Sequence, residues 1–173
     1  MSTTARCTDA ATGTKKWTYP TGSSASSPAV AGAVVYVGVA DGTVYAFDAA
    51  TGTKTWTYAT GSTVTSSPTV ADSVVYVGTT DGTVHVVDST DGTKKWVYPT
   101  GSTATSPVVT DAKVYVGTID GTVYALDVVT AAKRWTYPTG SASSSFAIAH
   151  GMLYVGAHDG TLYALDAVTG AGP

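Results

Sequence analysis

The sequence predicts an all-β protein assembled from four copies of one structural unit, and three observations lead to this prediction. The first is a repeat: a Trp recurs every 39 or 40 residues, and an Asp stands eight residues before each Trp. The second is composition, because the segments between turns are rich in Val, Tyr, Thr and Trp, which favour pleated strands. The third is that no window of helical length places apolar residues at i, i+3 and i+4. A period near 40 with strand-like segments is typical of a β-propeller blade.

The 173 residues are predicted to form one β-propeller domain, and the repeats align with a single length change. The extra residue of the second copy lies between Trp56 and Pro68, in a loop. A chain of this length can bury a sizeable core as a single domain. The repeats cover residues 9–47, 48–87, 88–126 and 127–165, with a remainder at 166–173.

Each unit is expected to contain four short antiparallel strands. In the first unit the inner strand covers residues 28–31, and the second strand covers residues 34–38. An Asp-Gly pair follows as a hairpin turn, because Gly readily adopts the positive φ that such a turn needs. The third strand covers residues 43–48, and a Thr-Gly turn leads to the fourth strand, which carries the Trp. The glycines of the hairpin turns are Gly42, Gly82, Gly121 and Gly160.

The two ends of the chain are expected to complete one blade between them. Residues 14–19 fit a fourth strand with no three strands before it, and residues 161–166 fit a third strand with no fourth strand after it. The N-terminal strand would then supply the outer strand of the last blade and remove an exposed sheet edge. Two arrangements satisfy this pairing: a closed four-bladed ring of one chain, or half of an eight-bladed ring formed by a homodimer.

At this point the repeat resembles a known family. The stretch from Tyr45 to Trp56, which reads YAFDAATGTKTW, is similar to the tryptophan-docking motif of pyrroloquinoline-quinone-type propellers, and the later copies share it. In that family the Trp docks on a neighbouring blade, which suits an indole because it combines a large apolar area with one N–H donor. The resemblance runs from Asp9 to Gly170. It implies that the four Trp residues are structural blade-docking residues: Trp17, Trp56, Trp96 and Trp135.

The recurring Asp residues are expected to stabilise turns rather than to take part in catalysis or ligand binding. An Asp before a turn can accept hydrogen bonds from the backbone N–H groups of that turn. The repeat that begins at Asp127 departs from the pattern at Ala131 and Ala132, so its turn is expected to be looser. The structural Asp residues are Asp48, Asp88, Asp127 and Asp166.

Composition excludes several classes of partner. The formal net charge is −3 and charged residues make up 12% of the chain, with no basic stripe, so no nucleic acid partner is expected. No apolar run approaches the length of a membrane span. The N-terminal residues contain no apolar segment of the kind found in a signal peptide. The family resemblance would imply an extracytoplasmic location if the chain is a fragment of a larger member. Cys7 lies outside the predicted repeats and is expected to be an exposed terminal thiol.

No catalytic, cofactor-binding or metal-binding residue is predicted, and the chain is not expected to be an enzyme. The quinone-dependent dehydrogenases of the resembled family use calcium ligands that include Glu and Asn, and this sequence contains no Glu, Asn or Gln. The three His residues fall at different repeat positions in two blades, which disfavours a shared metal site: His85, His150 and His158.

The remaining candidate site is the propeller axis. Ser- and Thr-rich segments lead into the inner strands, and their hydroxyls would surround the central channel, where a small polar ligand or a peptide could bind. The favoured interpretation is that small side chains are simply what fits where inner strands crowd together. The segments are residues 23–27, 62–67, 102–106 and 141–145.

Two functions of different classes follow. The favoured hypothesis is a non-catalytic binding or scaffolding module with a protein or peptide partner, assembled as a homodimer. The alternative is a fragment or degenerate relative of a quinone-dependent dehydrogenase. The near-identity of the copies also suits an engineered or recently amplified repeat protein with no native function of its own.

Overall fold

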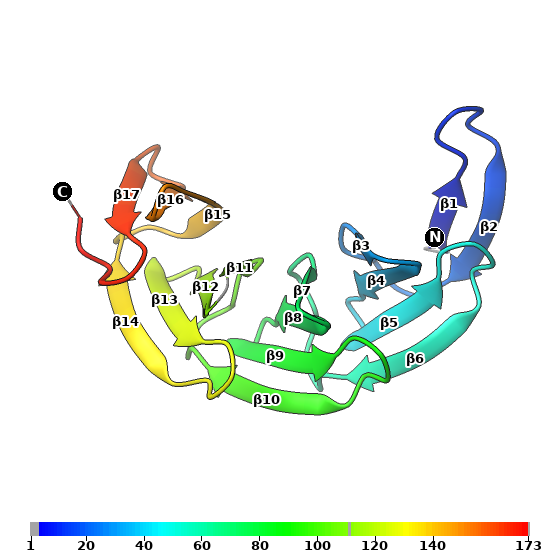
Figure 1. The fold of residues 1–173 in the computed structure, drawn as a ribbon, viewed down its shortest axis with the longest axis horizontal. Helices are drawn as coiled ribbons and strands as arrows, with labels where there is room; N and C mark the ends of the chain where they lie inside the picture. The colour runs from blue at the N-terminus through cyan, green and yellow to red at the C-terminus, as the bar shows by residue number, and fades with distance from the viewer. Residues whose placement is uncertain (1–3, 111, 173) are drawn as a thin grey trace.

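The computed structural model describes residues 4–110 and 112–172, and every regular element within them is a β-strand. Residues 1–3, 111 and 173, which the predicted domain includes, lie outside this described part. The strands form antiparallel sheets that follow one another along an open arc, with the two ends of the chain at its opposite tips (Figure 1). The predicted all-β class and four-stranded units are therefore confirmed. Within the described ranges no helix could cross a membrane.

Three sheets have four strands each. The first contains β3 (Ala29–Ala31), β4 (Val34–Gly38), β5 (Thr43–Asp48) and β6 (Lys54–Ala59). The second contains β7 (Thr69–Ala71), β8 (Val74–Gly78), β9 (Thr83–Asp88) and β10 (Lys94–Pro99). The third contains β11 (Val108–Thr110), β12 (Lys113–Gly117), β13 (Thr122–Asp127) and β14 (Lys133–Pro138). The short first strand of each sheet faces the concave side of the arc, and the Trp-bearing strand faces the convex side (Figure 1).

The two tips of the arc carry incomplete sheets. The C-terminal sheet has three strands, β15 (Ser143–Ala149), β16 (Met152–Ala157) and β17 (Leu162–Asp166). The N-terminal sheet has two, β1 (Thr4–Thr8) and β2 (Lys15–Pro20). The Trp strand at the N-terminus has no three strands before it, as predicted, but one strand that the sequence pattern did not predict, β1, precedes it. Strand β1 lies before the first predicted repeat and lacks the large apolar residues of the third strands. Since β2 pairs with β1, closure of the ring through β17 stays a prediction.

Local sequence explains the turns and the position of the Trp in each blade. At the first Asp-Gly turn, Gly42 has φ of 88°, and the Asp41 carboxylate accepts a hydrogen bond from the Thr43 N–H at 2.9 Å. Next to the Trp, β5 and β6 are out of step: Ala46 lies opposite Trp56, whereas the next residue of β5 lies opposite Lys54. This bulge adds one residue to the outer strand, and such a bulge bends the strand and re-aims its side chains.

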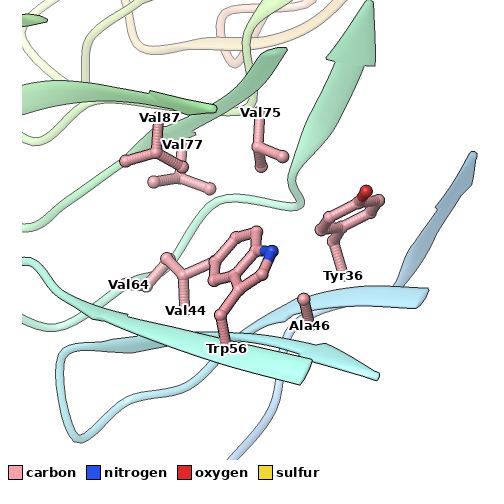
Figure 2. Packing of buried hydrophobic residues seen from close by; sticks show 8 residues of the cluster. All are labelled: Tyr36, Val44, Ala46, Trp56, Val64, Val75, Val77 and Val87. Atoms are coloured by element: carbon pink, nitrogen blue, oxygen red, sulfur yellow. The ribbon is translucent and has the colours of Figure 1, made fainter. Parts of the chain in front are cut away.

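The hydrophobic core lies between successive sheets rather than inside any one of them. Side chains from the first full sheet meet those of the second, and the indole of Trp56 lies between them (Figure 2). The buried members of this cluster are Tyr36, Val44, Ala46, Trp56, Val64, Val75, Val77 and Val87. Burial of one such side chain stabilises the fold by about 1.5–3 kcal/mol. Each blade therefore depends on the blade beside it.

Candidate functional sites at the blade joints and the inner rim

The four predicted docking Trp residues each reach from one sheet to a turn of the next. The Trp56 Nε1–H donates a hydrogen bond to the Ser89 carbonyl oxygen at 3.0 Å, and the side chain is only 8% exposed. The other three donate to the carbonyl at the matching position of the following turn: Trp17 to Ala49 at 2.9 Å, Trp96 to Val128 at 2.9 Å and Trp135 to Ala167 at 3.4 Å.

A Tyr from the second strand of the same sheet shares the carbonyl that the Trp binds. The Tyr36 hydroxyl donates to Ser89 at 3.2 Å, beside Trp56, and the two rings lie 5.8 Å apart. The Tyr115 hydroxyl donates to Ala167 at 2.7 Å. Sequence reasoning missed this role, although a signal was present: in every copy the Tyr stands twelve residues before the next Asp. Two donors on one carbonyl define what we call the blade joint.

Three of the four indoles also lie against the turn Gly of the next sheet: Trp17 on Gly52, Trp56 on Gly92 and Trp135 on Gly170. A Cβ placed on Gly92 would lie 2.7 Å from the Trp56 ring, so no side chain fits there without displacement. Gly92 has φ of 75°, whereas the matching residue of the next turn, Ala131, has φ of 60° despite its side chain. In the sheet that precedes Ala131, the rings of Tyr76 and Trp96 lie 6.4 Å apart, against 5.8 Å for Tyr36 and Trp56.

The recurring Asp side chains bind their own turns. The Asp48 carboxylate accepts hydrogen bonds from the N–H groups of Ala50 at 3.0 Å and Thr51 at 2.8 Å, and from the Thr51 hydroxyl. The Thr51 hydrogen bonds lower the pKa of Asp48 most. The pKa of Asp127 is lowered chiefly by Arg134, which pairs with its carboxylate. Asp9, in the first turn of the chain, makes the same contacts and has its pKa lowered to about 2, mainly by Thr12.

The glycines of the Asp-Gly turns lie where the next repeat approaches closely. A Cβ on Gly82 would lie 2.6 Å from the backbone N of Ser102, and one on Gly121 would lie 2.5 Å from that of Ser141. Gly42 faces Ser62 in the same way. The matching Cβ on Gly160, at the C-terminal tip, would meet open space.

The three His residues stay apart, and no group of three potential metal ligands forms within residues 4–110 and 112–172. His85 is buried in β9, with Nδ1 at 3.2 Å from the Tyr58 hydroxyl and Nε2 without a hydrogen-bond partner. Burial is the main cause that lowers the pKa of His85. His150 lies in the tight turn between β15 and β16, with φ of 52°. His158 lies at the rim of a pocket.

This pocket is lined by residues from three of the four predicted Ser- and Thr-rich segments. Its volume is about 320 Å³, and its lining includes Thr65, Thr103, Ser143, His158 and the exposed Ile119. Several hydroxyls around it are engaged by the backbone. The Ser66 hydroxyl accepts a hydrogen bond from the Gly78 N–H at 2.6 Å, and the Thr105 hydroxyl donates to the Gly117 carbonyl at 3.1 Å. The segment at residues 23–27 lies elsewhere, at the N-terminal tip.

The position of Cys7 differs from the exposed terminal thiol that the sequence predicts. Cys7 lies in β1, opposite Trp17, and therefore occupies a repeat position instead of a free tail. The thiol is half-buried and lines an open pocket of about 480 Å³ between the N-terminal sheet and the first full sheet. The same pocket is lined by Val30 and Val35.

Antiparallel sheets of up to four strands, packed face to face around an arc and connected by a Trp hydrogen bond at each joint, define a β-propeller repeat protein. A family model described as outer membrane protein assembly factor BamB matches residues 2–107 and again residues 101–172. The chain belongs to this family of pyrroloquinoline-quinone-type propeller repeats. No curated protein sequence matches the chain.

Solved structures show the same fold. The computationally designed Ika8 protein is 25% identical with a TM-score of 0.89, over 96% of this chain and 54% of Ika8. BamB from Moraxella catarrhalis is 25% identical with a TM-score of 0.81, over 92% of this chain and 55% of BamB. The quinohemoprotein alcohol dehydrogenase from Comamonas testosteroni is 18% identical with a TM-score of 0.81, over 99% of this chain and 39% of the enzyme, which shows the fold alone. The chain thus spans about half the length of the first two.

Proposed function

We propose that this chain is a non-catalytic binding and scaffolding module whose partner is a protein or peptide. The observation that carries the proposal is the use of its carboxylates. Those of Asp48, Asp127 and Asp166 each accept hydrogen bonds from two backbone N–H groups of their own turn, and that of Asp88 accepts one. A carboxylate held in this way is stabilised in its charged form and is a poor general acid or base near neutral pH.

The docking Trp residues and the turn glycines have structural roles in this proposal. Each Trp donates its single N–H to a carbonyl of the next sheet, and the rings of Trp17, Trp56 and Trp135 pack against the turn that carries this carbonyl. The indole therefore joins blades, which suits a rigid platform. Repeat folds that stack identical units typically present such a platform to extended partners.

The surface best suited to a peptide is the 320 Å³ pocket on the inner rim. Its lining includes small hydroxyl-bearing side chains, and Ile119, 57% exposed, offers one apolar contact. An extended peptide could pair polar groups along this rim while an apolar side chain covers Ile119.

A displayed library of extended peptides tests the surface. Peptides selected on the parent chain should lose binding to Ile119→Arg and keep binding to Val129→Arg, a more exposed apolar residue on a turn tip away from the pocket. Selected peptides that bind both variants alike would place the binding surface elsewhere and contradict this part of the proposal.

The enzymatic alternative is tested directly. The chain is titrated with pyrroloquinoline quinone and Ca²⁺ while the quinone absorbance is followed, and it is assayed with alcohols, sugars and an artificial electron acceptor. We expect an unchanged quinone spectrum and no turnover. Saturable binding followed by substrate oxidation would make the chain a quinone-dependent dehydrogenase and would overturn the non-catalytic proposal.

A further inference from the structure

The two tips of the arc carry complementary halves of one blade. We propose that two copies of this 173-residue chain assemble head to tail into a closed ring, in which β17 of one copy pairs with β2 of the other, and that β1 is a placeholder strand displaced in the process. This inference does not depend on the proposed function, because it concerns only the edges and faces at the two tips.

Strand β1 pairs with β2 in the same register in which the third strand of a full sheet pairs with the fourth strand. Both ladders contain five pairs, and both have a register shift before the last pair. On β2 the pairs are Thr4 with Pro20, Ala5 with Tyr19, Arg6 with Thr18, Cys7 with Trp17 and Thr8 with Lys15. On β14 the pairs are Thr122 with Pro138, Val123 with Tyr137, Tyr124 with Thr136, Ala125 with Trp135 and Leu126 with Lys133. Strand β1 therefore occupies the place where a third strand belongs.

The side chains of β1 are poor substitutes for those of a third strand. Where β13 has the buried residues Val123 and Leu126, β1 has Ala5 and Thr8, which are smaller or polar. The β17 sequence Leu162–Leu165 matches β13 closely and restores an apolar residue at both positions. Because each buried aliphatic side chain contributes to stability and Thr8 is exposed, β17 should bind the β2 edge more strongly than β1 does.

The outer face of the C-terminal sheet is exposed where its equivalents are buried. Leu162 is 71% exposed, whereas the residues at the same position in the other sheets, Val44, Val84 and Val123, are fully buried. Val44 is covered by side chains of the following sheet, as Figure 2 shows. Gly160 also lacks a neighbour. At the other Asp-Gly turns the backbone of the next repeat lies against the Gly, whereas the space beside Gly160 is open. This face fits a further sheet of the same kind.

The N-terminal tip lacks the contacts that the C-terminal tip offers. The Ala49 carbonyl receives the Trp17 N–H, but the two-stranded N-terminal sheet has no second strand to bring a Tyr to this joint. Tyr154 stands at that position in β16, and no sheet follows it within the described residues. In the assembled ring, the Tyr154 hydroxyl donates to Ala49 of the partner copy.

The open pocket at the N-terminal tip has the position of the missing strands. It lies beside Val35, which is only half-buried, whereas its counterparts Val75 and Val114 are fully buried. Strands β15 and β16 of the second copy would fill this space. The two tips lie far apart on the arc, so one chain cannot join them without bending sharply, whereas two arcs close under two-fold symmetry (Figure 1).

Two cysteine pairs, made in a Cys7→Ser background, test the strand exchange. Directly opposed residues of antiparallel strands have Cα atoms about 4.5–5.5 Å apart, within reach of a disulfide. Thr18→Cys with Tyr163→Cys should give a covalent dimer on oxidation. A crosslink within one chain would instead show a four-bladed ring, and absence of any crosslink would show that the two edges do not pair. Both results overturn the proposal.

The second pair tests the placeholder. Arg6→Cys with Thr18→Cys should lock β1 onto β2, so that the oxidised chain has the mass of one 17.4 kDa chain in light scattering and the reduced chain has twice that mass. Oxidised chains that still form the dimer would contradict displacement of β1. Reduction of the same sample serves as the control for correct folding.

Two N-terminal deletions and a charge at Leu162 test which strands form the dimer interface. Deleting residues 1–9 removes the competing strand and should tighten the dimer by roughly tenfold, because apparent affinity follows the fraction of chains whose β2 edge is free. Deleting residues 1–20 should abolish the dimer, since β2 is lost. Leu162→Asp should also leave a monomer, whereas Val129→Asp, at an exposed turn tip, should not. A dimer weakened by the shorter deletion would show that β1 is part of the interface and would overturn its placeholder role.

Discussion

Gly92→Ala tests whether the Trp joint stabilises the chain through close contact of the indole with the turn beneath it. A Cβ at Gly92 would lie 2.7 Å from the ring of Trp56, which is held on its other side by buried Val side chains and by its hydrogen bond to Ser89. The ring must therefore shift, and its N–H must move away from the Ser89 carbonyl.

Gly61→Ala is the matched control. Gly61 has φ of 84°, close to the 75° of Gly92, but a Cβ there has nothing within 4 Å. Both variants place Ala in the left-handed region, at a cost of about 1–2 kcal/mol. Both also gain about 0.4–1 kcal/mol from a less flexible unfolded chain. These effects cancel in the comparison, and the remaining difference is the forced overpacking, about 1–3 kcal/mol.

The free energy of unfolding is measured by urea titration, with the circular dichroism of the strands and the Trp fluorescence as signals. We expect Gly92→Ala to be less stable than Gly61→Ala by about 1–3 kcal/mol, with a change in the Trp fluorescence of the folded state. Equal losses in the two variants would refute the reasoning, because they would show that the turn tolerates a side chain beneath the indole.

Further predictions concern other blades. Ala131→Gly should raise the free energy of unfolding by about 0.5–1 kcal/mol, because it removes the cost of a left-handed Ala; a lower urea midpoint would contradict this. His85→Tyr should stabilise the chain more at pH 5 than at pH 7.5. The folded pKa of His85 is lowered from 6.5, so the contribution of neutral His85 is present above that value and is lost as pH falls; equal effects at both pH values would refute this. Asp48→Asn should flatten the fall in stability on acidification from pH 5. The lowered pKa of Asp48 contributes stability above 3.8 that is lost as pH falls through the folded pKa; an unchanged acid-unfolding curve would contradict this. Far-ultraviolet circular dichroism should show almost no helix, and a helical spectrum would contradict the fold.

The repeat of Trp, Asp and Asp-Gly determines the blade from sequence alone, because each of its signals is local. A turn glycine such as Gly42 is fixed by the φ of its own hairpin, and an Asp such as Asp48 binds the N–H groups of its own turn. The alternation of apolar residues in β5 sets which side chains enter the core. Local chemistry of this kind is visible wherever the residues adjoin in the chain, so the four-stranded unit and its strand boundaries could be predicted closely.

Contacts between blades join residues some 30 to 50 positions apart, and only the tertiary structure decides them. The Tyr36 hydroxyl and the Trp56 N–H meet on the Ser89 carbonyl, although nothing in the sequence marks Ser89 as an acceptor. Strand β1 was not predicted because it lies before the first recognisable repeat and has Arg6 where most other third strands have a half-buried Tyr such as Tyr124. The curvature that leaves the two tips apart arises from how tightly each sheet packs on the next, which depends on all the side chains of a joint together.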